Sequence, residues 1–319
     1  MAHVAVTRTI LDDGVAPLRP AHTVEMHEPD GDPTEEYLIE IAEGADALMT
    51  TVADPVTKRV IAACDHLRII AQYGVGVDNI DLEAAEQHGL IVTNTPGALT
   101  DTTADFTWAL LLGLARRVRA ADQYVRDGRF ERWETTLLLG PELAGKTMGI
   151  VGLGRIGAAV ARRALGFGME VIYHNRTRAN PTVERETNAR YVSKAELLER
   201  SDVISLHCPL NGDSRHWIDG AALKRMKSSA LLVNTARGPV VDEAALVDAL
   251  RTEEIAGAAL DVFEEEPEVH PGLLDADRVL LAPHLGSASV EARTRMGRMA
   301  SEAIQAVFAG NETIPYRLV

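Results

Sequence analysis

Three glycines near the middle of the chain have the spacing of a phosphate-binding turn. Gly152, Gly154 and Gly157 form the pattern Gly-x-Gly-x-x-Gly; the apolar run Met148 to Val151 precedes them and small residues, Ala158 to Leu165, follow. In a strand–turn–helix unit the first glycine permits the tight turn, the second lets backbone N–H groups approach a pyrophosphate, and the third lets the helix pack on its strand. The helix N-terminus adds partial positive charge. A plain glycine-rich turn is the alternative, but the flanking strand and helix favour a dinucleotide site.

Asn175 occupies the position that usually distinguishes the two nicotinamide dinucleotides, just after the predicted strand Glu170–Tyr173. A carboxylate at this position would accept hydrogen bonds from the adenosine ribose and select NAD. Its absence, with Arg176 and Arg178 close by, favours the 2′-phosphate of NADP. The alternative interpretation is that both arginines belong to a solvated turn.

Three further polar groups follow apolar runs nearer to the C-terminus: Arg237, the acidic run Glu264–Glu266, and His284. We expect the carboxyl ends of parallel strands to bring them to one edge of a sheet, where ligands bind. A guanidinium can hold a carboxylate through two parallel hydrogen bonds. An imidazole paired with a carboxylate can serve as a general acid toward a carbonyl. Taken singly, each group also has an ordinary explanation as a surface arginine, a solvated acidic loop or a structural histidine.

The elements that must position these groups alternate between β-rich and helical runs. Before residue 100, strands are predicted at His3–Thr7, Ala47–Thr51, Arg68–Ala71 and Leu90–Thr93, and helices at Pro33–Ala42, Thr57–Ala63 and Leu82–His88. After the glycine motif, strands are predicted at Glu170–Tyr173, Val203–His207, Ala230–Thr235, Gly257–Val262 and Val279–Ala282, and helices at Ala195–Glu199, Gly220–Arg225 and Glu243–Arg251. The alternation predicts an α/β fold with doubly wound parallel sheets.

The position of the glycine motif predicts two domains, because about 150 residues precede it, enough for a separate domain. The apolar helix predicted at Thr102–Val118 should be buried between domains or subunits. The last predicted helix, Ser289–Phe308, can return to the first domain. We therefore predict one domain from residues 1–100 and 288–319, and a dinucleotide-binding domain from residues 101–287.

Composition excludes several classes of partner. The net charge of −15 argues against nucleic acid and anionic membranes. No apolar stretch is long enough to cross a membrane, and no secretion signal is apparent. The two cysteines, Cys64 and Cys208, cannot form a disulfide framework, so we expect a cytoplasmic protein. No metal site is predicted.

The chain resembles the D-2-hydroxyacid dehydrogenases over nearly its whole length. Within that family it is most similar to the glyoxylate/hydroxypyruvate reductases. The segments that carry the resemblance are the glycine motif, Thr235–Gly238, Leu260–Pro267, Pro283–Ser287, Tyr73–Asn79, Thr93–Gly97, Asp105–Leu111, Gly140–Leu143 and His174–Arg178. The resemblance implies a Rossmann-type cofactor domain inserted in a flavodoxin-like substrate domain.

The resemblance also implies roles for individual residues. Arg237, Glu266 and His284 would be catalytic, and the backbone at Val75 and Gly76 would hold a substrate carboxylate. Trp133 would shape the substrate pocket, from its own or the neighbouring subunit; the alternative is local packing in a loop. Contacts with the dinucleotide are implied at Thr103, Gly152, Gly154, Arg155, Ile156, Gly157, Asn175, Arg176, Thr177, Arg178, Cys208, Pro209, Thr235, Ala236, Asp261 and Gly286.

The implied activity is reduction of a small 2-keto acid, glyoxylate or hydroxypyruvate, to the 2-hydroxy acid. NADP(H) is the expected cofactor, with NAD(H) also accepted, and a homodimer is expected through the 102–118 helix region. Two alternatives stay open. A 3-phosphoglycerate dehydrogenase has the same catalytic residues, although some relatives carry a C-terminal extension that is absent here. A corepressor of the same fold would bind rather than catalyse, which the net charge of −15 disfavours.

Overall fold

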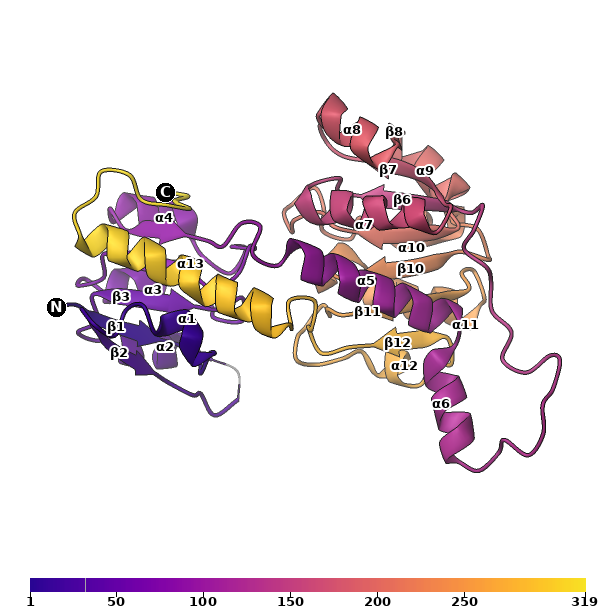
Figure 1. Cartoon of the computed structure of the whole chain (residues 1–319), viewed down its shortest axis with the longest axis horizontal. Helices are drawn as coiled ribbons and strands as arrows, with labels where there is room; N and C mark the ends of the chain where they lie inside the picture. The colour runs from indigo at the N-terminus through magenta and orange to yellow at the C-terminus, as the bar shows by residue number, and fades with distance from the viewer. Residues whose placement is uncertain (32) are drawn as a thin grey trace. The chain divides into compact units, whose positions relative to one another are not determined.

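The computed structural model of the protein describes residues 1–31 and 33–319. The chain forms two compact units, called here unit 1 (Met1–Leu99 and Ser287–Val319) and unit 2 (Thr100–Gly286). Unit 1 is built from both ends of the chain and unit 2 from its middle (Figure 1). The boundaries expected from the sequence lie one residue later, after residues 100 and 287.

Unit 1 contains, in its described part, a five-stranded parallel sheet with the order β2-β1-β3-β4-β5. This is the order of a flavodoxin-like doubly wound sheet. The strands are β1 (His3–Val6), β2 (Thr23–Met26), β3 (Ala47–Thr50), β4 (Ile69–Gln72) and β5 (Ile91–Thr93). The helices are α1 (Asp12–Val15), α2 (Glu35–Ala42), α3 (Lys58–Ala63), α4 (Leu82–Gln87) and α13 (Val290–Phe308).

Unit 2 contains a seven-stranded parallel sheet with the order β12-β11-β10-β9-β6-β7-β8, the Rossmann order with one added edge strand. The strands are β6 (Thr147–Val151), β7 (Glu170–His174), β8 (Ala189–Tyr191), β9 (Val203–Leu206), β10 (Leu231–Asn234), β11 (Gly257–Leu260) and β12 (Val279–Leu281). The helices are α5 (Thr100–Ala115), α6 (Val118–Arg126), α7 (Arg155–Gly166), α8 (Pro181–Thr187), α9 (Lys194–Arg200), α10 (Gly220–Arg225), α11 (Glu243–Arg251) and α12 (Pro271–Leu274). The predicted parallel α/β architecture is confirmed.

Apolar side chains cover both faces of each sheet, which explains why the strands are continuous apolar runs. In β10, Leu231 and Val233 belong to the core on the side of α5 and α7, whereas Leu232 belongs to the core on the other face. The same alternation occurs in β1, where Val4 and Ala5 belong to opposite cores. Since successive side chains of a strand point to opposite faces, every residue of the central strands β3, β4, β9, β10 and β11 is buried.

The long apolar helix differs from the prediction at its end. α5 stops at Ala115, and Arg117 adopts a left-handed conformation (φ 53°) before α6 begins. α5 packs within unit 2, where Trp108 is 4% exposed and donates a hydrogen bond from Nε1 to the Val160 carbonyl of α7 at 3.1 Å. Packing inside unit 2 therefore buries one side of α5, and the expected burial between domains or subunits stays a prediction. α6 has no buried residue and extends away from the sheet (Figure 1).

The predicted return of the last helix to the first domain is reflected in unit 1, where α13 packs on α1 and β4 (Figure 1). Gly297 of α13 meets Gly14 of α1 so closely that a Cβ atom on Gly297 would lie 2.6 Å from the Gly14 Cα. Ser301, one turn later, donates a hydrogen bond to the Gly14 carbonyl at 2.7 Å. The helix pair thus depends on the absence of side chains at this crossing.

Gly297→Ala should lower the free energy of unfolding by about 1–3 kcal/mol, the usual cost of overpacking, because a backbone must shift to admit the methyl group. Urea denaturation followed by circular dichroism measures the change. Gly166→Ala is the matched control: no atom lies within 4 Å of its Cβ position, and the change should be neutral or stabilising by up to about 1 kcal/mol. Equal effects of the two substitutions would refute the close crossing.

Candidate active site

Three loops at the carboxyl edge of the unit 2 sheet carry the polar groups. The loop after β10 carries Arg237, the loop after β11 carries Glu266, and the loop after β12 carries His284. His284 Nδ1 and Glu266 Oε2 are 2.8 Å apart. The other carboxylate oxygen, Oε1, accepts a hydrogen bond from the Phe263 N–H at 2.9 Å. The histidine and the carboxylate thus form a pair of fixed orientation.

The environment of Glu266 favours its ionised form. Burial acts to raise the pKa of this carboxyl group, but the hydrogen bond and positive charge of His284, the Phe263 N–H and the charge of Arg237 outweigh it. The pKa of Glu266 therefore lies below its ordinary value. A carboxylate that stays charged can stabilise a protonated imidazole.

The acidic run divides into three separate roles. Glu264 is bonded away from His284: its Oε1 lies 2.5 Å from His216 Nε2, and its Oε2 accepts the Glu243 N–H at 3.2 Å. Glu265 is exposed to solvent. The geometry thus assigns only Glu266 to His284.

The backbone at Arg237 is fixed by hydrogen bonds to the side chain of Asn234. The side chain of Asn234, which is 1% exposed at the end of β10, donates to the Arg237 carbonyl at 2.8 Å and accepts from the Ala236 N–H at 3.0 Å. Gly238 lies against the next loop, since a Cβ atom there would be 1.8 Å from the Phe263 carbonyl oxygen. The loops of Arg237 and Glu266 therefore pack backbone to backbone. Asn234 is a positioning residue missing from our sequence analysis; its only signal is an amide ending an apolar strand.

Asp261 connects the ends of β11 and β12. Its two carboxylate oxygens accept hydrogen bonds from the N–H groups of Leu285 (2.6 Å) and Gly286 (2.7 Å), and its carbonyl accepts the His284 N–H at 2.8 Å. Burial raises the pKa of Asp261 to about 6, against the lowering effect of these hydrogen bonds. A Cβ atom on Gly286 would lie 3.1 Å from Asp261 and 3.3 Å from Thr103, so these three candidate residues lie together.

The glycine motif has the shape that a dinucleotide requires. A Cβ atom on Gly152 would lie 2.6 Å from the Cys208 nitrogen, and one on Gly157 would lie 2.2 Å from the Gly152 oxygen. Gly152 also has a φ of +97°, which disfavours other residues. The Cβ position of Gly154 faces open space, and no side chain caps α7, which begins beside it. The first N–H groups of that helix can therefore hold a pyrophosphate.

The groups expected to select NADP are not equivalent in the structure. Arg178 is bound to Glu184 through two hydrogen bonds, of 2.8 and 3.0 Å. Arg176 lies 3.3 Å from Asp213. The side chain of Arg176 is 80% exposed and that of Asp213 is 78% exposed. The side-chain oxygen of Asn175 accepts the Leu153 N–H at 2.7 Å, which supports the glycine turn.

The remaining candidates for cofactor contact surround the same edge of unit 2. Thr235 Oγ1 lies 2.9 Å from Thr107 Oγ1, which donates to the Thr103 carbonyl. Burial raises the pKa of the Cys208 thiol to about 11, so it stays protonated at neutral pH. Arg155, Thr177 and Pro209 are exposed, and Ile156 and Ala236 are half-buried.

Val75 and Gly76 lie in unit 1, in the loop after β4. Their carbonyl oxygens accept hydrogen bonds from Asn94 Nδ2 at 2.8 Å and from Gln72 Nε2 at 3.0 Å. Among residues 1–31 and 33–319, their N–H groups have no protein acceptor. These amides remain able to bind an anion.

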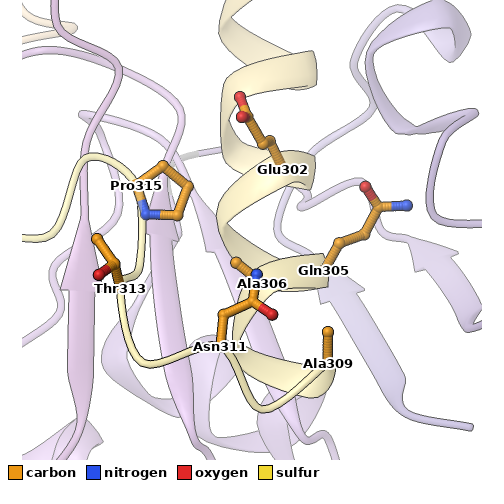
Figure 2. Close-up of a pocket in the computed structure, with 7 residues that line it drawn as sticks. All are labelled: Glu302, Gln305, Ala306, Ala309, Asn311, Thr313 and Pro315. Atoms are coloured by element: carbon orange, nitrogen blue, oxygen red, sulfur yellow. The ribbon is translucent and has the colours of Figure 1, made fainter.

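Trp133 and the pocket of unit 1 lie outside this arrangement. Trp133 is 77% exposed, so the alternative that it packs locally in its loop is wrong. A pocket of about 450 Å³ lies between α13 and residues 311–315, lined mainly by Gln305, Asn311, Thr313 and Glu302 (Figure 2). The pocket has no histidine or arginine that could act on a keto acid. In the described part of the chain, no group of acidic, histidine or cysteine residues could hold a metal ion, and no helix could span a membrane.

Comparisons with known proteins agree with this geometry. Residues 108–286 match the family described as D-isomer specific 2-hydroxyacid dehydrogenase, NAD binding domain. A glyoxylate reductase of Thermococcus litoralis is 48% identical, with 99% of this chain and 96% of the relative covered, and one of Korarchaeum cryptofilum is 47% identical, with 99% and 95% covered. The crystal structure of an NADPH-dependent glyoxylate/hydroxypyruvate reductase of Sinorhizobium meliloti, in complex with NADP and malonate, is 31% identical with a TM-score of 0.87, covering 100% of this chain and 97% of that one.

Glu264→Gln should lower the free energy of unfolding by about 1–3 kcal/mol, because a charged acceptor of two hydrogen bonds is replaced by a neutral amide. Glu265→Gln, at an exposed neighbour, should change it by less than about 0.5 kcal/mol. Urea denaturation of both variants provides the comparison. If Glu265→Gln were the more harmful, the division of roles within the acidic run would be wrong.

Proposed function

Since the chain belongs to the D-isomer specific 2-hydroxyacid dehydrogenase family and is an NAD(P)-dependent oxidoreductase that reduces a 2-keto acid, we propose that its substrates are glyoxylate and hydroxypyruvate and that NADPH is its preferred reductant. The hydrogen bond between His284 and Glu266 is the observation that carries the proposed reduction, and the names of the relatives support the choice of keto acid.

His284 is the general acid in this proposal. Its Nδ1 is bound to Glu266, which leaves Nε2 to donate a proton to the carbonyl oxygen of the keto acid. Glu266 orients the ring and stabilises its protonated form. When bound, the reduced nicotinamide supplies a hydride to the carbonyl carbon.

Arg237 binds the substrate carboxylate and stabilises the negative charge that develops on the carbonyl oxygen. In unit 1, the N–H groups of Val75 and Gly76 are the groups that we propose for binding a carboxylate. Holding the keto acid in one orientation supplies a large part of the rate enhancement. Asp261 and Thr103 lie on the side of the nicotinamide in this assignment.

For the cofactor, we propose that Arg176 is the residue that pairs with the 2′-phosphate. Arg178 is engaged by Glu184, whereas Arg176 is exposed and has a single, exposed partner. Position 175 carries no carboxylate that would repel the phosphate. The family uses both NAD(H) and NADP(H), so NADH is accepted with lower efficiency.

We further propose a homodimer formed through α5 and α6, with Trp133 reaching the substrate pocket of the neighbouring subunit. α6 and the segment after it carry several exposed apolar side chains. The exposed fractions are 54% for Val118, 59% for Val125, 58% for Phe130 and 77% for Trp133. Clustered apolar side chains of this kind mark association surfaces.

The purified protein should oxidise NADPH in the presence of glyoxylate or hydroxypyruvate, and His284→Ala should lose roughly 10²–10⁴-fold in kcat, the contribution of a positioned general acid. The affinity for NADPH should not change. Absorbance at the NADPH band follows turnover, and fluorescence titration gives the affinity. Pyruvate and phosphohydroxypyruvate complete the panel. A preference for phosphohydroxypyruvate would replace the proposed substrate, and full activity of His284→Ala would remove the acid from the mechanism.

Glu266→Gln should move the alkaline limit of keto-acid reduction to lower pH by about one unit or more, because a neutral amide no longer stabilises the imidazolium. The sign follows from the charges: the Glu266 carboxylate lies 2.8 Å from His284 Nδ1, and glutamine brings no negative charge to that position. Profiles of kcat/KM against pH give the limit. Glu264→Gln, whose carboxylate is bonded elsewhere, is the control and should leave the limit in place. Identical profiles for Glu266→Gln and the parent protein would reject the pairing.

Arg176→Ala should lower the ratio of kcat/KM for NADPH to that for NADH roughly three- to tenfold, the range for a charge contact on an open rim. Arg178→Ala is the matched control, and its ratio should stay within about twofold, because that guanidinium is committed to Glu184. If this ratio changed more in Arg178→Ala, or in neither variant, Arg176 would not bind the 2′-phosphate.

A further inference from the structure

We propose that Gln72, Asn79 and Asn94 are positioning residues that fix the peptides from Gly74 to Val77 with three consecutive N–H groups directed toward the substrate carboxylate. This inference rests on the proposed function and deepens it. It concerns unit 1 alone, and it explains how a loop without charged ligands can bind an anion.

Three consecutive carbonyl groups of this loop are held by three different donors. The Gly74 carbonyl accepts from the Thr95 N–H at 2.9 Å, the Val75 carbonyl from Asn94 Nδ2 at 2.8 Å, and the Gly76 carbonyl from Gln72 Nε2 at 3.0 Å. Two of these donors come from the end of β5 and one from the end of β4. Each carbonyl is therefore anchored to the sheet.

Anchoring the carbonyls fixes the N–H groups. In a planar trans peptide the C=O and the next residue's N–H point in opposite directions. The N–H groups of Val75, Gly76 and Val77 therefore point away from the donors that hold the carbonyls of the preceding residues, Gly74 to Gly76. In the described residues none of the three has a protein acceptor. Successive N–H groups of this kind form an anion-binding concavity.

One of these donors, Gln72, is itself fixed by a second amide, that of the half-buried Asn79. Gln72, at 0% exposed, uses its second N–H on Asn79 Oδ1 at 2.9 Å, and its oxygen accepts from Thr50 Oγ1 at 2.7 Å. Asn79 donates to the carbonyls of Thr51 and Asp54 at 3.0 and 2.8 Å. Both N–H bonds of each side-chain amide are thus used in hydrogen bonds, and the network connects the loops after β3 and β4. Buried networks that are fully satisfied rigidify their surroundings.

Rigidity of this loop has a consequence for substrate binding. Amides that already point at the position of the carboxylate need no reorganisation when the anion binds. A carboxylate that is present in both the substrate and the transition state is held equally in each, so loosening the loop should raise KM with little effect on kcat. This split separates positioning from a purely structural role.

Gln72→Met and Asn94→Ala each remove the side-chain donor to one loop carbonyl. Asn94 is half-buried, so its replacement does not disturb the core. We expect KM for glyoxylate to rise about five- to tenfold in each, the value of one lost hydrogen bond. We expect kcat to stay within about threefold and the NADPH affinity to be unchanged. The dissociation constant of oxalate, measured by calorimetry with the NADPH-loaded protein, should rise by the same factor as KM.

Gln305→Met is the matched control, because Gln305 also donates from its amide to a backbone carbonyl of unit 1, that of Pro17 at 2.7 Å, and lines the separate pocket of Figure 2. It should leave KM and oxalate binding unchanged. The positioning role is overturned if Gln72→Met and Asn94→Ala change KM for glyoxylate and the dissociation constant of oxalate no more than Gln305→Met does. The proposed function stands in that case, provided that the parent protein is active. A parent protein that reduces no keto acid would instead overturn the proposed function.

Discussion

The buried carboxyl group of Asp261 is the interaction on which the site in unit 2 depends. It accepts the N–H groups of Leu285 and Gly286, so the chain that leaves β12 is tied to the end of β11. His284 adopts a left-handed conformation (φ 55°) immediately before these two residues. That conformation is rare for a residue with a side chain, and the surrounding hydrogen bonds maintain it. The position of the histidine relative to Glu266 follows from this connection.

The same arrangement, a buried amide at the end of a strand, occurs in both units. In unit 2 the buried amide of Asn234, at the end of β10, holds the backbone beside Arg237. In unit 1 the buried amide of Gln72, at the end of β4, holds the backbone beside Gly76. Each strand thus ends in a neutral amide that hydrogen-bonds to the backbone of the following loop. Such amides are satisfied inside the protein and carry no net charge, so their burial costs little.

The sequence predicted what depends on regular periodicity and local spacing. Continuous apolar runs indicated the central strands, and the glycine spacing indicated the turn before α7. It did not predict β2, whose residues are at most half-buried, nor α6, which has no buried residue, because neither is a continuous apolar run. The choice of Glu266 came from the family resemblance rather than from the residues. Only the fold shows that Glu264 is bonded to His216 and Arg178 to Glu184.

A double-mutant cycle between positions 266 and 284 tests the central claim most directly. The parent protein, Glu266→Gln, His284→Ala and the double variant are compared by kcat for glyoxylate reduction with NADPH. If Glu266 acts only through His284, the double variant is about as slow as His284→Ala alone, since residues that work as one unit are strongly non-additive. If the two losses multiply instead, Glu266 and His284 act independently and the account of the site is contradicted.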